Sequence, residues 1–304
     1  MSIALQVALV MVTILVVLLV IGAPIGVAIG MSSAVSMICM IPADVSFATS
    51  AQRIFAGSNS FSLIAIPFFI LAGNIMNNGG IATRLVNCAK VISGRMPGAL
   101  AQSNVVANML FGAISGSGAA AAAAMGGTIG PLEEKEGYDK NYSTAVNVAS
   151  APVGMLIPPS NTMIVYSSVA GSVSIAALFM AGYIPGLLWG GAVMILAGIM
   201  AKKRGYQAEQ RVPVKVALKT FWQAIPSLLL IVIVIGGILG GIFTATEGSA
   251  IAVVYATVLS LIYKAFKIKD IPRIVLEAAK TTGIITFMIG LSSIMSWAMA
   301  FTGI

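Results

Sequence analysis

Two interruptions in a long apolar sequence constrain this chain more than any other feature. The first covers residues 115–118, within L-F-G-A-I-S-G-S-G, and the second covers residues 154–160, within V-G-M-L-I-P-P-S. Both fall where a membrane-spanning helix should continue. A backbone in hydrocarbon must satisfy its own N–H and C=O groups, so such breaks are tolerated only against protein or a water-filled cavity. The pair therefore predicts a binding site made of broken helices.

The composition places the chain in a membrane. Hydrophobic residues make up 59% and charged residues 9% of 304 residues, which indicates an integral membrane protein rather than a soluble domain. The net charge of +8 comes from basic residues in short loops between apolar runs, a topology signal that argues against nucleic-acid binding. Cys39 and Cys88 have no metal-binding or disulfide spacing, and histidine is absent. The apolar start reads as a membrane anchor rather than a cleaved signal.

The apolar runs predict an all-α fold with several membrane spans. Spans are expected over residues 3–21, 24–42, 60–77, 174–201, 218–242, 245–264 and from 283 to the end, with amphipathic segments at 43–59, 82–93 and 271–280. Residues 104–114 would advance only about 16 Å as a helix, roughly half the hydrocarbon thickness. With residues 119–129 they predict a re-entrant helical hairpin. Residues 142–168 are long enough to cross but are broken.

The distribution of basic residues supports the hairpin. If the loop at 131–141 is cytoplasmic, 16 of the 17 Lys and Arg residues lie on that side, and the N-terminus is periplasmic. An uninterrupted crossing at 104–130 would reverse every later loop. In this interpretation the charged loop after Pro131 lies in water, and the run K-K-R-G-Y at 202–206 is a solvated topology signal and no more.

The order of the spans predicts an inverted-topology repeat, an architecture common in secondary transporters. The part from residue 218 repeats the span order of the first part in the opposite direction, and a second hairpin would follow Ile304, so the chain is interpreted as a fragment. Four divisions are predicted. They are first-repeat scaffold helices and an interfacial arm at 1–97, a transport-domain hairpin and broken helix at 98–173, a connecting helix and basic loop at 174–217, and truncated second-repeat scaffold helices at 218–304.

The two breaks carry the chemistry of a carrier rather than of an enzyme. Carbonyl ends of half-helices suit a bare monovalent cation, and N–H ends suit a carboxylate. Neutral oxygens and donors are added by Ser115, Ser117, Ser160, Asn161 and Thr162. The breaks hold no titratable group of the kind that proton coupling requires, which favours sodium. The serines have no base to activate them, so nucleophilic catalysis is not expected.

Simpler interpretations remain for several residues. The S-G-S-G sequence occurs in many tight turns, and Asn104 and Asn108 suit interhelix hydrogen bonds as well as ligand binding. Glycines at 22, 26 and 30 are spaced for close helix packing, but Gly22 is equally a turn residue before Pro24. The alanine run at 119–124 suits a close-packing face.

Eight ordered segments of the chain form a distinctive set. They are G-A-P-I-G-V-A-I-G at 22–30, I-P-F-F-I-L-A-G-N-I-M-N-N-G-G-I at 66–81, L-F-G-A-I-S-G-S at 110–117, E-G-Y-D at 136–139, I-P-P-S at 157–160, L-F-M-A-G-Y-I-P-G-L-L at 178–188, A-K-K-R-G-Y at 201–206 and F-T-A-T-E at 243–247. Together they resemble the large membrane subunit of tripartite ATP-independent periplasmic (TRAP) transporters of the dicarboxylate and sialic-acid type. The resemblance covers essentially the whole chain.

The resemblance implies an elevator-type carrier in the bacterial inner membrane that couples uptake of an organic anion to sodium. It implies a small membrane subunit and a periplasmic substrate-binding protein as partners. Its sodium ligands carry over onto Ser115, Gly116, Ser117, Gly154, Ile157 and Pro158. The N–H ends of the half-helices then place the substrate carboxylate near Ser117, Gly118, Ser160, Asn161 and Thr162. The alternatives are an ion channel or pore on a similar hairpin, and a non-transporting structural subunit.

Overall fold

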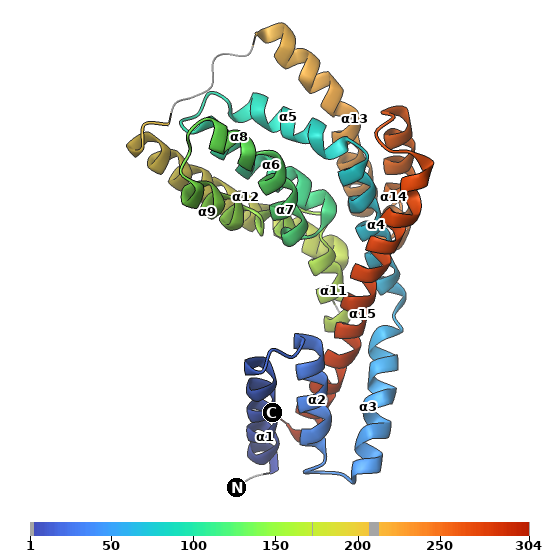
Figure 1. Ribbon diagram of the computed structural model, residues 1–304. Helices are drawn as coiled ribbons and strands as arrows, with labels where there is room; N and C mark the ends of the chain where they lie inside the picture. Colours follow the sequence, from blue (N-terminus) through green and yellow to red (C-terminus); the bar gives the residue numbers. More distant parts are fainter. Residues whose placement is uncertain (1–2, 172, 207–212, 304) are drawn as a thin grey trace. The chain divides into compact units, whose positions relative to one another are not determined.

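The structure is a computed structural model that describes residues 3–171, 173–206 and 213–303, and within these residues it contains helices and no strands (Figure 1). It divides into two compact units, one of Met1–Leu63 with Lys280–Ile304 and one of Ile64–Ala279. These two units are defined by how the helices pack. The four divisions predicted from the sequence are defined by which parts move during transport, so they stay predictions.

The smaller unit contains α1 (Ile3–Val20), α2 (Ile25–Met37), α3 (Ala43–Ser58) and the later part of α15 (Ile271–Thr302). Gly26 and Gly30 of α2 face Leu291 of α15, and a Cβ on Gly30 would lie 2.5 Å from a Leu291 methyl carbon. Gly22 has open space around it and a φ of +89°. The glycine spacing therefore serves close helix packing at Gly26 and Gly30, while Gly22 is a turn residue.

The larger unit holds both interruptions. Its helices are α4 (Ala65–Asn78), α5 (Ile81–Ser93), α6 (Ala99–Ser115), α7 (Gly118–Thr128), α8 (Gly130–Lys135), α9 (Lys140–Ser150), α10 (Val153–Leu156), α11 (Asn161–Ala170), α12 (Ile175–Lys203), α13 (Val214–Leu239) and α14 (Ala245–Ile262). A short 3-10 helix, η2 (Ile268–Asp270), also belongs to this unit, whereas η1 (Phe61–Ile64) belongs mostly to the smaller one. α4 packs mainly on α14, and α5 packs on α6 and α13.

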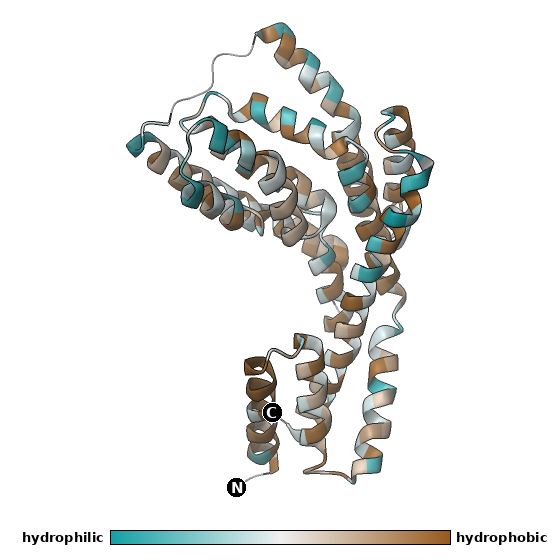
Figure 2. Cartoon of the chain, viewed as in Figure 1, coloured by the Kyte–Doolittle hydropathy of each residue, from teal (hydrophilic) through white to brown (hydrophobic). Residues whose placement is uncertain are grey.

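Six helices of the described residues are long and apolar enough to cross a membrane. They are Ile3–Val20, Phe61–Asn78, Ile175–Lys203, Val214–Leu239, Ala245–Ile262 and Ile271–Thr302. Figure 2 shows the hydrophobic colouring along α1 and the hydrophilic colouring on α8 and at the end of α12. The expectation of an all-helical, multi-pass membrane protein is confirmed by these helices.

Two expected elements differ from the structure. α2 has 13 residues, fewer than the run at 24–42 and fewer than a single crossing needs. The amphipathic segment at 271–280 and the last span form one continuous helix of 32 residues, α15. The sequence between them, T-T-G, costs helix stability without stopping a helix, because an internal glycine costs only about 1 kcal/mol.

Candidate functional site

The first interruption is a two-residue turn between α6 and α7. α6 ends at Ser115, and Gly116 follows with a left-handed φ of +63°, a conformation that a residue with a Cβ rarely adopts. Ser117 then begins α7, because its Oγ accepts a hydrogen bond of 3.2 Å from the backbone N–H of Ala120. The S-G-S sequence thus ends one helix and caps the next within three residues.

The two helices form a hairpin, as expected. Asn104, in the first turns of α6, and Gly126, near the end of α7, line the same cavity, so the chain returns to where α6 began. Asn147 of α9 joins both arms. Its Nδ2 donates to the carbonyl of Ala122 in α7 at 2.8 Å, and its Oδ1 accepts from Asn108 Nδ2 in α6 at 3.0 Å.

The second interruption separates α9 and α10 from α11. The helices Lys140–Leu156 and Asn161–Ala170 form a pair bent by 49° at this break. The residues between them, Ile157 to Ser160, include the proline pair Pro158–Pro159. Ser160 caps α11, since its Oγ accepts from the backbone N–H of Met163 and also donates to the carbonyl of Met155.

The structure brings the two interruptions together. A Cβ on Gly112 of α6 would lie 2.7 Å from Cα of Gly154, so α6 and α10 touch through their backbones. A Cβ on Gly116 would lie 2.6 Å from Nδ2 and 3.0 Å from the backbone N of Asn161. On α7, a Cβ on Gly118 would lie 2.8 Å from the sulfur of Met155. A side chain at Gly112 or Gly116 would push backbone atoms apart, whereas at Gly118 the flexible side chain of Met155 could move aside.

Glycines of α4 and α12 hold this junction from two sides. A Cβ on Gly73 of α4 would lie 3.0 Å from Cα of Ser115. On α12, glycines four residues apart face the second interruption: Gly186 lies against Ile157, and Gly190 lies against Val153 of α10 and Met109 of α6. The sequence itself indicates this contact, because its glycines at 182, 186 and 190 are four residues apart, a spacing that favours close helix packing.

A buried amide cluster holds the hairpin to α9. Asn108 is fully buried, and its Nδ2 lies 2.9 Å from Asn104 Oδ1 and 2.8 Å from Ser150 Oγ, besides the bond to Asn147. These contacts join α6 to α9. Of the two interpretations left open for Asn108, the structure supports that of interhelix hydrogen bonding.

Four helix ends meet at the junction. α6 and α10 end there and α7 and α11 begin there, so the carbonyl ends of two helices lie beside the N–H ends of two others. The carbonyl of Ser115 accepts a long bond of 3.4 Å from Asn161 Nδ2. Asn161 is 7% exposed, and its Oδ1 has no hydrogen-bond partner among the described residues. A buried amide oxygen beside a weakly bonded carbonyl fits a small monovalent cation, because both are neutral oxygen ligands.

The residues expected to form the site lie at or beside this junction. Ser115, Gly116, Gly118, Gly154, Pro158, Ser160 and Asn161 are buried, Ser117 and Ile157 are half-buried, and Thr162 is exposed. The structure therefore gathers the ten residues around the two breaks, with the side chain of Thr162 at the surface. The sequence interpretation missed Asn147 and Met155, which have no motif of their own.

Two G-Y sequences form a contact that the sequence interpretation excluded. Gly137 and Gly205 end α8 and α12 in the same way, and the N–H that follows each bonds back to a carbonyl five residues earlier. This places Tyr138 and Tyr206 in stacking contact, with ring centroids 4.3 Å apart. Arg204 also pairs with Asp139 at 3.0 Å. The prediction that 202–206 is only a solvated signal is therefore wrong.

This contact, the tyrosine latch of Tyr138, Asp139, Arg204 and Tyr206, ties the end of the hairpin to α12. Tyr206 Oη accepts the backbone N–H of Asp139 at 2.8 Å. Asp139 accepts from the backbone N–H of Tyr142, and this bond, together with the Arg204 guanidinium, lowers the pKa of its carboxyl group. The carboxylate is therefore ionised at neutral pH and caps α9.

Removing the latch ring should weaken the larger unit. Tyr206→Ala removes the stacking and the Asp139 acceptor, and we expect a loss of about 2 kcal/mol in the free energy of unfolding. Thermal unfolding in detergent measures it. Tyr166→Ala is the control, because that ring is 59% exposed and should cost little. Equal losses in both variants would contradict a specific role for the latch.

A family model gives the first comparison with known proteins. Residues 12–304 match the model described as the tripartite ATP-independent periplasmic transporter, DctM component. The match includes both interruptions, the latch and the glycine face of α12.

Curated relatives agree with this match. The uncharacterized protein YgiK of Salmonella typhimurium is 51% identical over 268 residues, 88% of this chain and 62% of YgiK. The C4-dicarboxylate TRAP transporter large permease protein DctM of Rhodobacter capsulatus is 37% identical over 84% of this chain and 61% of DctM. The sialic acid TRAP transporter large permease protein SiaM of Vibrio cholerae is 37% identical over 83% of this chain and 59% of SiaM.

The chain thus spans about three fifths of the length of these relatives. Two of the three are named as transport permeases, in agreement with the expectation that the chain is not an enzyme. The family match over residues 12–304, together with the membrane-length helices, shows that this chain belongs to the DctM component family, the large permeases of TRAP transporters.

Proposed function

We propose that the chain forms part of a permease for sodium-driven uptake of an organic anion that carries a carboxylate. C4-dicarboxylates, sugar acids and sialic acids are the candidate substrates, since relatives are named for C4-dicarboxylate, sialic acid and 2,3-diketo-L-gulonate. The site of both ligands is the junction where the two interruptions meet.

The unpartnered Oδ1 of Asn161 carries this proposal. An unsatisfied buried acceptor costs about 1–3 kcal/mol, so such a group is tolerated where a ligand supplies its partner. The residues able to hold a sodium ion beside it are Ser115, Gly116 and Ser117 of the hairpin turn, together with Gly154, Ile157 and Pro158 of the second break. Sodium bound there would neutralise the carbonyl ends and favour an anion close by.

The N-termini of α7 and α11 suit the substrate carboxylate. Their caps, Ser117 and Ser160, are adjacent to Gly118 and Asn161, whose backbone N–H groups belong to the unsatisfied first turns. Thr162 follows on the exposed side. The carboxylate would therefore accept hydrogen bonds from backbone N–H groups and from the Ser117 hydroxyl, without a cationic side chain.

The wider architecture is proposed from the family. A periplasmic binding protein would deliver the anion, and a small membrane subunit would accompany this chain in the inner membrane, with the N-terminus in the periplasm. The hairpin and broken helix at 98–173 would move as an elevator against scaffold helices, and the inverted repeat would supply a second hairpin. The basic loops, with 16 of 17 cationic residues on one side, support this orientation.

Sodium coupling is testable with one side chain. The full-length permease, with its small subunit and binding protein, is reconstituted in proteoliposomes, and uptake is measured at increasing Na+. We expect uptake to require Na+, and Asn161→Leu to raise the half-saturating Na+ concentration about tenfold or more, because one lost polar ligand is worth about 1.4 kcal/mol or more.

Asn141→Leu is the control, since Asn141 is exposed at the start of α9 and should leave the Na+ dependence unchanged. Uptake that ignores Na+ in the unmodified protein would contradict the proposal and favour a channel or passive pore. Uptake that continues without this subunit would identify it as a structural component.

A further inference from the structure

Glu133 is a buried carboxyl group that the proposed transport site does not use. The sequence places it in a charged loop expected to lie in water, but its side chain is only 1% exposed. It sits in α8, directly after the hairpin, and α8 packs on α6, α7 and α9. The expectation of a solvated loop is therefore wrong at this position.

The surroundings of Glu133 leave its charge uncompensated. In the described part of the chain it forms no ion pair. Asn104 of α6 and Ser143 of α9 face the carboxyl group, close enough to favour its ionised form slightly. Among the described residues, however, Glu133 Oε1, Asn104 Nδ2 and Ser143 Oγ have no hydrogen-bond partner. An isolated buried carboxylate is costly, and the usual response is to bind a proton.

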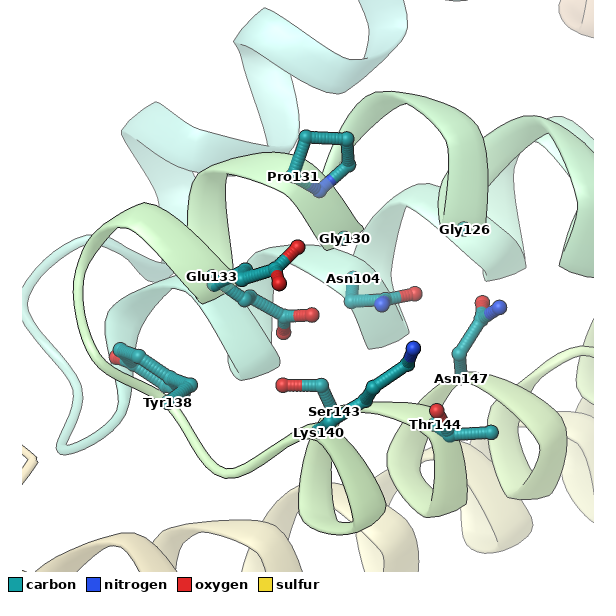
Figure 3. Close-up of a pocket in the computed structure, with 11 residues that line it drawn as sticks. Asn104, Gly126, Gly130, Pro131, Glu133, Tyr138, Lys140, Ser143, Thr144 and Asn147 are labelled. Carbon is teal, nitrogen blue, oxygen red and sulfur yellow. The ribbon is translucent and has the colours of Figure 1, made fainter.

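A cavity of about 360 Å³ gives the group access to water (Figure 3). Asn104, Ser143 and Asn147 surround the hollow, and Lys140 extends into it. Because such a volume holds several water molecules, protons can reach the carboxyl group without unfolding of α8.

The other charged and titratable groups near Glu133 lie around this cavity. α6 and α7 contain no charged residue. Glu134 and Lys140 line the cavity and are exposed, while the buried phenols of Tyr138 and Tyr142 lie nearby. No group of three or more His, Cys, Asp or Glu residues able to hold a metal ion occurs among the described residues. The ligand that fits Glu133 is the proton.

We propose that Glu133 is a proton-binding site at the base of the α6–α7 hairpin, and that loss of its proton loosens α8 from α6 and α9. Burial raises the pKa of Glu133 from 4.5 to about 7. For an acid with a raised pKa, the closed form is favoured at low pH and is weakened as the pH rises from the unfolded value through about 7. The hairpin base would thus respond to pH changes near neutrality.

Hydrogen exchange of residues 129–136 in the full-length protein tests this without measuring transport. Each observed exchange rate is compared with the intrinsic rate at the same pH, which gives a protection factor. We expect this factor to fall about tenfold between about pH 6 and about pH 8, because the pKa of Glu133 is higher in the closed form than in the open form. The Glu133→Gln variant should have the same protection at both pH values, because glutamine cannot ionise. Glu134→Gln, its exposed neighbour, should behave as the unmodified protein.

Infrared difference spectroscopy identifies the group. A carboxylic acid C=O band should be present near pH 6, lost near pH 8, absent in Glu133→Gln and kept in Glu134→Gln. If Glu133→Gln fails to fold, Glu133→Asp should still give a shifted band. A band absent at both pH values would overturn the proposal, and so would protection that follows Na+ or K+ concentration at fixed pH.

Discussion

Gly154→Ala should abolish uptake and lower the free energy of unfolding by about 3 kcal/mol. The added Cβ would lie 2.6 Å from the carbonyl carbon of Gly112 and 2.8 Å from the carbonyl oxygen of Asn108, and closer still to Cα of Gly112. These neighbours are backbone atoms, so no side chain can rotate away. The hairpin and the broken helix would have to separate, and the junction of the four helix ends would be lost.

Chemical denaturation in detergent measures the stability, and proteoliposome uptake measures the function. Gly127→Ala in α7 is the matched control, since its added Cβ would meet no described residue within 4 Å outside the backbone of its own helix. That change should be neutral or stabilising by up to about 1 kcal/mol, because alanine has the higher helix propensity. Normal uptake by Gly154→Ala would show that the backbone contact between α6 and α10 is dispensable.

Much of the fold was predictable because the membrane imposes strong rules on sequence. Apolar length predicts most spans within a few residues, as at 174–201 against Ile175–Lys203. The S-G-S and I-P-P-S sequences predict where helices stop, since a left-handed glycine and a serine cap have local causes. The start of the hairpin was harder to predict than its turn. The apolar pattern predicts a first helix over residues 104–114, but α6 begins at Ala99, because neutral polar residues such as Gln102 and Ser103 extend it.

The contacts of the site could not be predicted from local sequence. Asn147 and Met155 touch the hairpin because α9 and α10 pack on α6 and α7, and no motif marks that packing. Glu133 resembles Glu134 and Glu136 in sequence, yet only Glu133 faces the interior of the helix packing. The latch likewise pairs residues 67 positions apart, Asp139 and Tyr206. Such pairings depend on tertiary packing, which a single sequence records only weakly.

Gly116→Ala should raise the half-saturating Na+ concentration for uptake about tenfold or more, from the loss of one polar ligand of the ion. Two effects act at this position. A Cβ in the left-handed region costs about 1–2 kcal/mol, and the same Cβ would lie 2.6 Å from Asn161 Nδ2. The second effect displaces the amide whose unpartnered Oδ1 we assign to sodium, so function should suffer beyond what stability alone explains.

Gly171→Ala separates the two effects. Gly171 ends α11 with a φ of +70°, as Gly116 ends α6 with +63°, but its added Cβ would meet no described residue within 4 Å apart from its chain neighbours. Both variants should lose similar stability from the backbone, while only Gly116→Ala should change the Na+ dependence. An equal shift in both would mean that helix-end strain, and not the position of Asn161, controls the affinity for sodium. An unchanged Na+ dependence in Gly116→Ala would remove the hairpin turn from the proposed site.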